Sequence, residues 1–403
     1  MMTLIRKYAV MAALSLLIFS CSEDDGDLDL EGSAKEYANI RLVVSDATTN
    51  TVSIISPATA EVQNLDATHA TSSVYPSGSG RYAALVHRAQ NLVEFIDTGL
   101  ELHGNHVDIH HAEAAFGSLT ATGLSPTHFK SRYNQLLLFN DGDGTLSSAS
   151  EGDINEETDM KTLSFDGIAH HGAMTIFSNG SYSVTVKDNT VEGTLPERVK
   201  VIDIDGHTLY ASEVQTQGIH GSATNGDVAL YGSVDGILVV ASSGEQHLID
   251  YPTDFGEVWI GSLSETFSDN LFIGSASGLG LYLINIANES ITELVENSEI
   301  MKYALSLDET QLAVLTYEGS LQIYDLTTQT LVEEKSGLIP ANDKPTGHGA
   351  TLPNLALTEG YIYITQPATG EILQFSTSSL SHTASYTVSS TPQSMALLGY
   401  EMN

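Results

Sequence analysis

The sequence predicts an all-β protein, a single β-propeller of four-stranded blades, on three observations. Short runs of alternating apolar residues, such as residues 40–44 and 92–96, follow one another with almost no helical periodicity. Glycine is frequent, at 34 residues, and proline is sparse, at 10, which suits many tight turns and few breaks. A longer pattern also recurs every ~40 to 45 residues, which is the length of one blade.

The repeat is clearest in residues 76–97 and 306–326, where a polar turn leads into an apolar strand and a second strand follows. It recurs more loosely near residues 226–231 and 359–364. The starts of the expected innermost strands lie near Ser72, Thr127, Ala173, Gly221, Val258, Tyr303, Ala350 and Ser394. This spacing favours eight blades, with seven as the alternative.

The two ends of the repeat complement each other. The first unit, residues 38–65, lacks an inner strand, and residues 392–400 form a strand without a blade. Joining them removes the open sheet edges that would template aggregation. We therefore expect the C-terminal strand to close the ring within one domain, residues 38–403.

The N-terminus predicts export. Arg6 and Lys7 precede an apolar run at residues 8–19, and Cys21, the only cysteine, follows directly. Residues 1–21 therefore resemble a lipoprotein signal peptide that ends at an acylated lipobox cysteine; the alternative is an ordinary signal peptide with a chance cysteine. Residues 22–37 are then an acidic flexible tether. The expected location is the outer membrane, on either its periplasmic or its surface leaflet.

The charge balance excludes some partners. The chain has 51 acidic against 15 basic residues and a formal net charge of −36. Such a field repels nucleic acid and anionic lipid headgroups and attracts cations. We expect no nucleic-acid partner, membrane contact only through the lipid anchor, and a monomer. Adaptation to a salty environment explains the charge equally well.

The chain has 14 histidines, and several stand directly before expected inner strands. Inner strands of a propeller start at the same mouth of the central channel, so these imidazoles converge there. Imidazole is the commonest neutral metal ligand, and a zinc site needs three or four converging donors. The alternative is that they only form hydrogen bonds between blades. The residues concerned are His128, His170, His171, His220 and His348.

A second cluster lies within residues 102–113. We expect this segment to follow an outer strand ending near Asp97, and so to fold over the same mouth. Its nitrogen and oxygen donors suit exchangeable zinc, with copper and nickel as alternative metals. A solvated polar loop is the other interpretation. Its candidate ligands are His103, His106, Asp108, His110 and His111.

Ordered stretches of the chain resemble the AztD-type periplasmic zinc metallochaperones. These stretches include Pro126-Thr127-His128, Phe139-Asn140-Asp141-Gly142-Asp143-Gly144, His170-His171-Gly172 and Ile219-His220-Gly221, with residues 75–83, 91–99 and 103–106. The resemblance implies a zinc-loaded propeller without catalysis, with the zinc-binding protein of an ABC importer as partner. It also implies zinc ligands at His103, His106, His128, His170, His171 and His220.

Two departures bear on function. Asp108 stands where a third histidine of the loop motif is expected, and a lipid anchor is unlike a freely diffusing carrier. The leading interpretation is a non-enzymatic protein that captures and transfers zinc, as a metallochaperone or a surface scavenger. A metal-dependent propeller hydrolase such as a lactonase is one alternative, although no nucleophile elbow or serine triad motif is present. A surface adhesion or scaffold propeller is the other.

Overall fold

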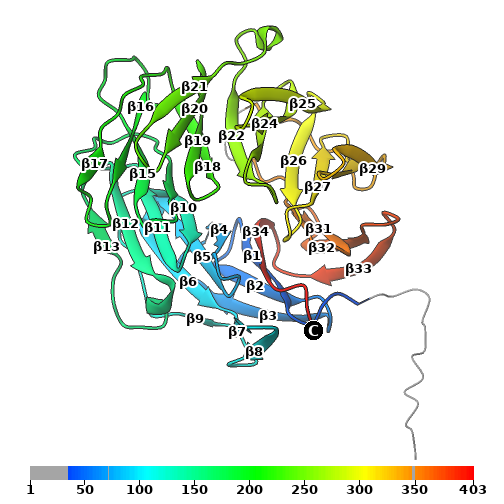
Figure 1. The fold of residues 1–403 in the computed structure, drawn as a ribbon. Helices are drawn as coiled ribbons and strands as arrows, with labels where there is room; N and C mark the ends of the chain where they lie inside the picture. Colours follow the sequence, from blue (N-terminus) through cyan, green and yellow to red (C-terminus); the bar gives the residue numbers. More distant parts are fainter. Residues whose placement is uncertain (1–34, 71, 347–349) are drawn as a thin grey trace, which may run out of the picture. The chain divides into compact units, whose positions relative to one another are not determined.

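The computed structural model describes residues 35–70, 72–346 and 350–403, and in these residues eight four-stranded antiparallel sheets follow one another along the chain. In most neighbouring sheets the first strands contact each other, and the sheets stand around a central channel like blades (Figure 1). The predicted all-β propeller is confirmed with eight blades, and the seven-blade alternative is wrong. Cys21 and His348 lie outside the described residues.

The first four blades each order their strands from the channel outward. The first blade has β34 (Pro392–Gly399), β1 (Ile40–Asp46), β2 (Thr51–Ser56) and β3 (Glu61–Asp66). The second has β4 (Ser73–Pro76), β5 (Tyr82–His87), β6 (Leu92–Asp97) and β9 (Ala115–Phe116). The third has β10 (Pro126–Arg132), β11 (Gln135–Asn140), β12 (Thr145–Ser150) and β13 (Lys161–Leu163). The fourth has β14 (Met174–Ile176), β15 (Tyr182–Val186), β16 (Arg198–Ile202) and β17 (Thr208–Tyr210).

The remaining blades follow the same order. The fifth has β18 (Ile219–Thr224), β19 (Val228–Ser233), β20 (Gly236–Ala241) and β21 (Gln246–Ile249). The sixth has β22 (Ile260–Glu265), β23 (Leu271–Ala276), β24 (Gly280–Asn285) and β25 (Ser290–Glu296). The seventh has β26 (Ile300–Leu305), β27 (Gln311–Thr316), β28 (Leu321–Asp325) and β29 (Thr330–Lys335), and the eighth has β30 (Leu355–Leu357), β31 (Tyr361–Gln366), β32 (Glu371–Ser376) and β33 (His382–Thr387).

Three short 3-10 helices and one hairpin lie outside these sheets. The helices are η1 (Arg88–Gln90), η2 (Glu151–Asp153) and η3 (Thr253–Phe255). The hairpin consists of β7 (Leu100–His103) and β8 (His106–Ile109). No helix within the described residues is long and apolar enough to span a membrane.

The core lies between blades rather than within them. One apolar cluster joins Val86 and Phe95 of the second blade to Phe129 and Leu136 of the third. A middle strand therefore has both faces covered, which is why β31 is buried at every residue while the outer strand β29 is mostly exposed. Continuous apolar runs such as β5 follow from this two-sided burial.

The C-terminal strand closes the ring as predicted. Strand β34 pairs with β1 from Ile40 opposite Gly399 to Asp46 opposite Pro392, and so supplies the inner strand of the first blade. The buried Asp46 carboxylate fastens this junction by accepting hydrogen bonds from the backbone N–H groups of Thr48 and Thr391, at 2.7 and 2.5 Å. Burial alone raises the pKa of Asp46, but these donors and nearby hydroxyls bring the pKa well below its usual value.

The closure predicts a stability effect at Asp46. Asp46→Ala leaves partly buried N–H groups without their acceptor, and we expect it to lower the free energy of unfolding by about 1–2 kcal/mol in urea titrations at pH 7. The depressed pKa means that the carboxylate stabilises the fold above the unfolded-state value of about 3.9, and that this stabilisation is lost as the pH falls further. The exposed Asp66, at the end of β3, is the control. An equal loss from Asp66→Ala contradicts the assignment.

Candidate metal centre

A β-bulge recurs where the inner strands enter the channel. The strand register shifts between Pro126 and His128 in β10, and between His220 and Ser222 in β18. The same shift occurs between Ile260 and Ser262 in β22, and between Ile300 and Lys302 in β26. Bulges bend a strand and change the direction of its side chains. Here they set the side chains that stand at one mouth of the channel.

Three of the predicted histidines meet at this mouth. Nε2 of His171 lies 3.3 Å from Nε2 of His128 and 3.1 Å from Nε2 of His220. Tetrahedral zinc with Zn–N bonds of about 2.0–2.1 Å places neighbouring nitrogens roughly 3.3 Å apart. The ring centroids of His128 and His220 are 6.2 Å apart, so the three imidazoles form an open row with His171 in the middle.

The hydrogen-bond partners of the Nδ1 atoms decide which ring nitrogen carries the proton. Nδ1 of His171 lies 2.8 Å from Oδ2 of Asp141, and Nδ1 of His220 lies 2.6 Å from the carbonyl oxygen of Gly261. A carboxylate and a carbonyl oxygen only accept, so Nδ1–H donates in both rings. In a neutral imidazole Nε2 then carries a lone pair. Two lone pairs therefore face each other at 3.1 Å, an arrangement that repels until a cation lies between them.

A carboxylate holds the middle histidine in place. Asp141 accepts from His171 and from the Arg88 guanidinium, whose Nη2 is 3.2 Å away. Burial raises the pKa of Asp141, but hydrogen bonds from His171 and Thr127 outweigh this and lower it. A carboxylate behind a histidine in this way fixes its tautomer and raises its basicity as a ligand. Asp141 was not predicted as a site residue, although it lies in one of the stretches that carry the family resemblance.

His128 completes the row as a neutral group. Burial, together with the neighbouring His171, lowers the pKa of His128 to about 4. The imidazole is therefore uncharged at neutral pH and keeps a lone pair for a metal ion. Hydrogen bonds between blades are therefore compatible with a metal site. Nδ1 of His171 and Nδ1 of His220 form the hydrogen bonds between blades, and the two Nε2 atoms face the candidate site.

His170 points elsewhere. Its Nδ1 donates to the carbonyl oxygen of Ile168 at 2.6 Å, and its Nε2 lies 3.1 Å from the hydroxyl of Thr185. The side chain is buried against Phe139, and burial lowers its pKa. Both ring nitrogens are engaged within the protein, so the structure separates His170 from the row that its neighbour joins.

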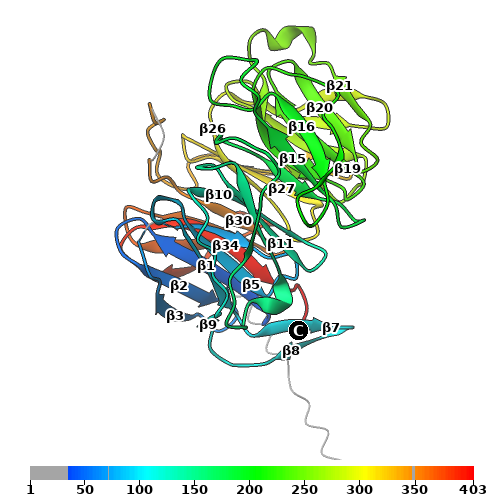
Figure 2. The same ribbon diagram turned by 90° about the vertical axis from the view of Figure 1, so that its left-hand side faces the viewer.

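The His-rich segment does not cover this mouth, and that expectation was wrong. The segment follows β6, which is the third strand of its blade, and the outer strand β9 comes only afterwards. In an antiparallel sheet the third strand runs parallel to the first, so it ends at the face opposite to the one where the first strand begins. Asp97 at the end of β6 pairs with Tyr82, beside the end of inner strand β4. The β7–β8 hairpin therefore leaves the face opposite the three histidines. Figure 2 shows the hairpin standing out from the blades.

The hairpin brings its own ligand atoms together. Nδ1 of His103 and Nε2 of His106 lie 3.2 and 3.4 Å from the two carboxylate oxygens of Asp108. Among the described residues this is the only group of three His, Cys or acidic residues whose ligand atoms all lie within 4.8 Å of one another. The three side chains are 76%, 61% and 46% exposed.

The two remaining histidines of the segment do not join that group. Nε2 of His110 lies 2.6 Å from Glu101, and Nε2 of His111 lies 3.4 Å from Asp97 at the hairpin base. Nδ1 of His111 also contacts the carbonyl oxygen of Glu113. These contacts tie both imidazoles to the base of the hairpin, away from its tip.

Comparisons with known proteins agree with this architecture. The zinc chaperone AztD of Citrobacter koseri is 22% identical over 334 residues, which are 80% of this chain and 78% of that protein. Its crystal structure superposes with a TM-score of 0.80 at 18% identity, covering 91% of this chain and 99% of that one, and the structure of apo AztD gives 0.77. The dihydro-heme d1 dehydrogenase NirN is also similar, with a TM-score of 0.61 at 14% identity, 88% of this chain and 74% of that one. No family model matches the sequence.

The tautomers can be tested directly. In metal-free protein at neutral pH we expect ¹⁵N–¹H spectra of the imidazoles to show protonated Nδ1 and bare Nε2 for His171 and His220, because each Nδ1–H has a fixed acceptor. Asp141→Ala should release this preference at His171 and leave that of His220 unchanged. Protonation of Nε2 in either wild-type ring contradicts the assignment.

Proposed function

We propose that this chain binds zinc at the mouth of its channel and passes it to another zinc-binding protein. The observation that carries the proposal is the position of Nε2 of His171, 3.1 Å from Nε2 of His220 and 3.3 Å from Nε2 of His128. Three imidazoles in one row, with both neighbouring Nε2 pairs near the spacing of zinc ligands and the middle ring backed by a carboxylate, are a donor set that zinc favours. Similarity to a zinc chaperone supports the same function.

The geometry favours exchange over permanent storage. Structural zinc sites are closed by four protein ligands, whereas three ligands leave one position open. A ligand from a receiving protein can enter at that position before the histidines release the ion. The His171 side chain is 31% exposed, so the mouth is accessible to such a ligand. Copper and nickel also bind imidazole, and zinc is preferred here because of the resemblance to the chaperone.

The hairpin serves as a second, weaker site in this proposal. His103, His106 and Asp108 are held close together but are exposed, and a site of two nitrogens and one oxygen in water holds zinc less tightly than buried imidazoles do. Such a site captures and releases the ion readily. His110 and His111 are support residues of the hairpin base rather than ligands.

The location and partner are part of the proposal. Residues 1–21 act as a lipoprotein signal peptide, Cys21 carries the lipid, and residues 22–37 tether the propeller to the outer membrane. The recipient is the zinc-binding protein of an ABC importer; on the outer leaflet the same protein is a zinc scavenger. The net charge of −36 draws zinc to the surface in either case.

An enzymatic role has less support. A metal-dependent hydrolase needs an open metal position and also a free general base. The carboxylate nearest the row, Asp141, is occupied by His171 and Arg88. Similarity to a dehydrogenase shows only that the propeller fold also occurs in enzymes. A purely structural role for the histidines is the remaining alternative, and zinc titration separates it from the proposal.

Replacing the ligands tests the channel site. His128→Ala combined with His220→Ala should weaken zinc binding more than about 100-fold in chelator competition, because one imidazole remains. Asp141→Ala, which removes only the support of His171, should weaken it by about 10- to 100-fold. His207→Ala, a fully surface imidazole at 80% exposure, is the control. Unchanged affinity in the double variant excludes the channel site.

Replacing the hairpin ligands tests whether the channel holds the tight zinc site and the hairpin the weaker one. His103→Ala with His106→Ala should leave the tightest zinc site intact and remove a weaker one from the titration, because the two sites lie on opposite faces. Elemental analysis and stoichiometric titration measure this. Loss of the tight site in this variant reverses the assignment of the two sites.

A further inference from the structure

A cavity opens at the same mouth of the channel as the three histidines. Ile260 pairs with Ala276 and Ile300 pairs with Thr316, so the turns after β23 and β27 lie at the faces where β22 and β26 begin. The cavity of about 390 Å³ lies between these elements and is bordered by Ser262, which follows the Gly261 that His220 contacts. Its volume falls within the range of small-molecule sites, about 300–1,000 Å³.

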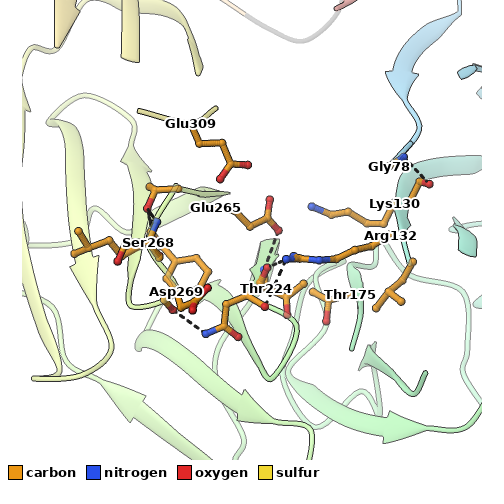
Figure 3. Close-up of a pocket in the computed structure, with 15 residues that line it drawn as sticks. Gly78, Lys130, Arg132, Thr175, Thr224, Glu265, Ser268, Asp269 and Glu309 are labelled. Carbon is orange, nitrogen blue, oxygen red and sulfur yellow. Dashed lines mark hydrogen bonds between the residues drawn. The ribbon is translucent and has the colours of Figure 1, made fainter. Parts of the chain in front are cut away.

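The lining of this cavity is unusual for so acidic a chain. Among the described residues, Lys302, Lys344, Tyr303, Tyr317 and several serines face it, and no Asp or Glu does. Three other cavities each include at least one carboxylate. At the other end of the channel, Lys130 and Arg132 face Glu265 and Glu309 across a cavity (Figure 3). The basic groups there have nearby counter-charges.

The repeated bulge places Lys302 at the same level of the channel as His128. Lys302 follows the bulge in β26 as His128 follows it in β10, so the two occupy equivalent positions in their blades. The third and seventh of eight blades stand on opposite sides of the channel. Lys302 therefore faces the metal centre from across the mouth.

The ammonium group of Lys302 has no counter-charge within the described part of the chain. No hydrogen bond or ion pair engages it there. Its surface is open to the channel, but surrounding protein lowers its pKa by burial. Lys344 is partly neutralised, because its Nζ lies 3.3 Å from Glu299 and 3.1 Å from the carbonyl oxygen of Ser298. The hydroxyl of Tyr303 bonds those of Ser262 and Ser264, at 3.3 and 3.4 Å.

We propose that this cavity binds a small carboxylate or phosphate anion at the same mouth of the channel as the candidate metal centre. Ammonium and hydroxyl groups are donors for such oxygens, and an anion there neutralises Lys302. Imidazole ligands bring no negative charge of their own to a divalent ion, so an anion at the same mouth and zinc attract each other and favour each other's binding. This last step alone rests on the proposed zinc function.

Titration of zinc-free protein tests the cavity independently of zinc. Inorganic phosphate and succinate are titrated separately by calorimetry, which distinguishes the two kinds of anion. Saturable binding of at least one is expected, with affinity about tenfold weaker or more in Lys302→Met and retained in Lys302→Arg. Lys161→Met, at an exposed lysine on another blade, is the control for net charge. Tyr303→Phe removes one donor and should weaken binding less than Lys302→Met.

The outcomes separate the two proposals. Anion binding that Lys302→Met removes supports the cavity even if zinc does not bind. Binding that is absent in the wild type, or equal in Lys302→Met and Lys161→Met, overturns it even if zinc binds tightly. Thermal unfolding of each variant establishes that the fold is intact.

Discussion

The pairing of β34 with β1 is the constraint on which the candidate metal centre depends. His128, His171 and His220 come from the third, fourth and fifth blades, and no single sheet holds two of them. Nε2 of His171 stays 3.3 Å from Nε2 of His128 and 3.1 Å from Nε2 of His220 only because neighbouring blades are packed at fixed angles around a closed ring. An open ring lets the blades splay apart, and the site loses its geometry before any ligand changes.

Charge is distributed unevenly around that site. The chain carries 51 acidic and 15 basic residues, yet Lys130, Arg132, Lys302 and Lys344 line two cavities along the channel. The acidic surface concentrates cations from solution, whereas the cavity that holds Lys302 and Lys344, at the mouth of the three histidines, has basic groups and no carboxylate among its described residues. In the proposed function, a metal ion drawn to the acidic surface binds to the imidazoles at this mouth. This arrangement suits entry and exit of the ion by the same face.

Much of the architecture could be predicted from the sequence. The ~40- to 45-residue period and the unmatched strands at the two ends indicated the blade count and the closure, because turns and apolar runs are local signals. The hairpin was misplaced because the outer strand β9 is only two residues, Ala115–Phe116, too short to leave a pattern, so β6 was taken as the outer strand. That error moved residues 102–113 to the wrong face.

The site was predicted in outline but not in detail. His128, His171 and His220 were expected to converge because each precedes an inner strand. The sequence could not separate His170 from His171, since adjacent residues differ only in the direction of the side chain, which packing against Phe139 decides. Asp141 was not predicted as a site residue, because its contact with His171, thirty residues away in sequence, is purely tertiary.

A zinc-loaded crystal tests the central claim most directly. An anomalous difference map collected at the zinc absorption edge should show a peak about 2.0–2.1 Å from the Nε2 atoms of His128, His171 and His220. Such a peak establishes that the three histidines are ligands of one ion. A map with no peak at this mouth, or with a peak only at His103, His106 and Asp108, contradicts the account.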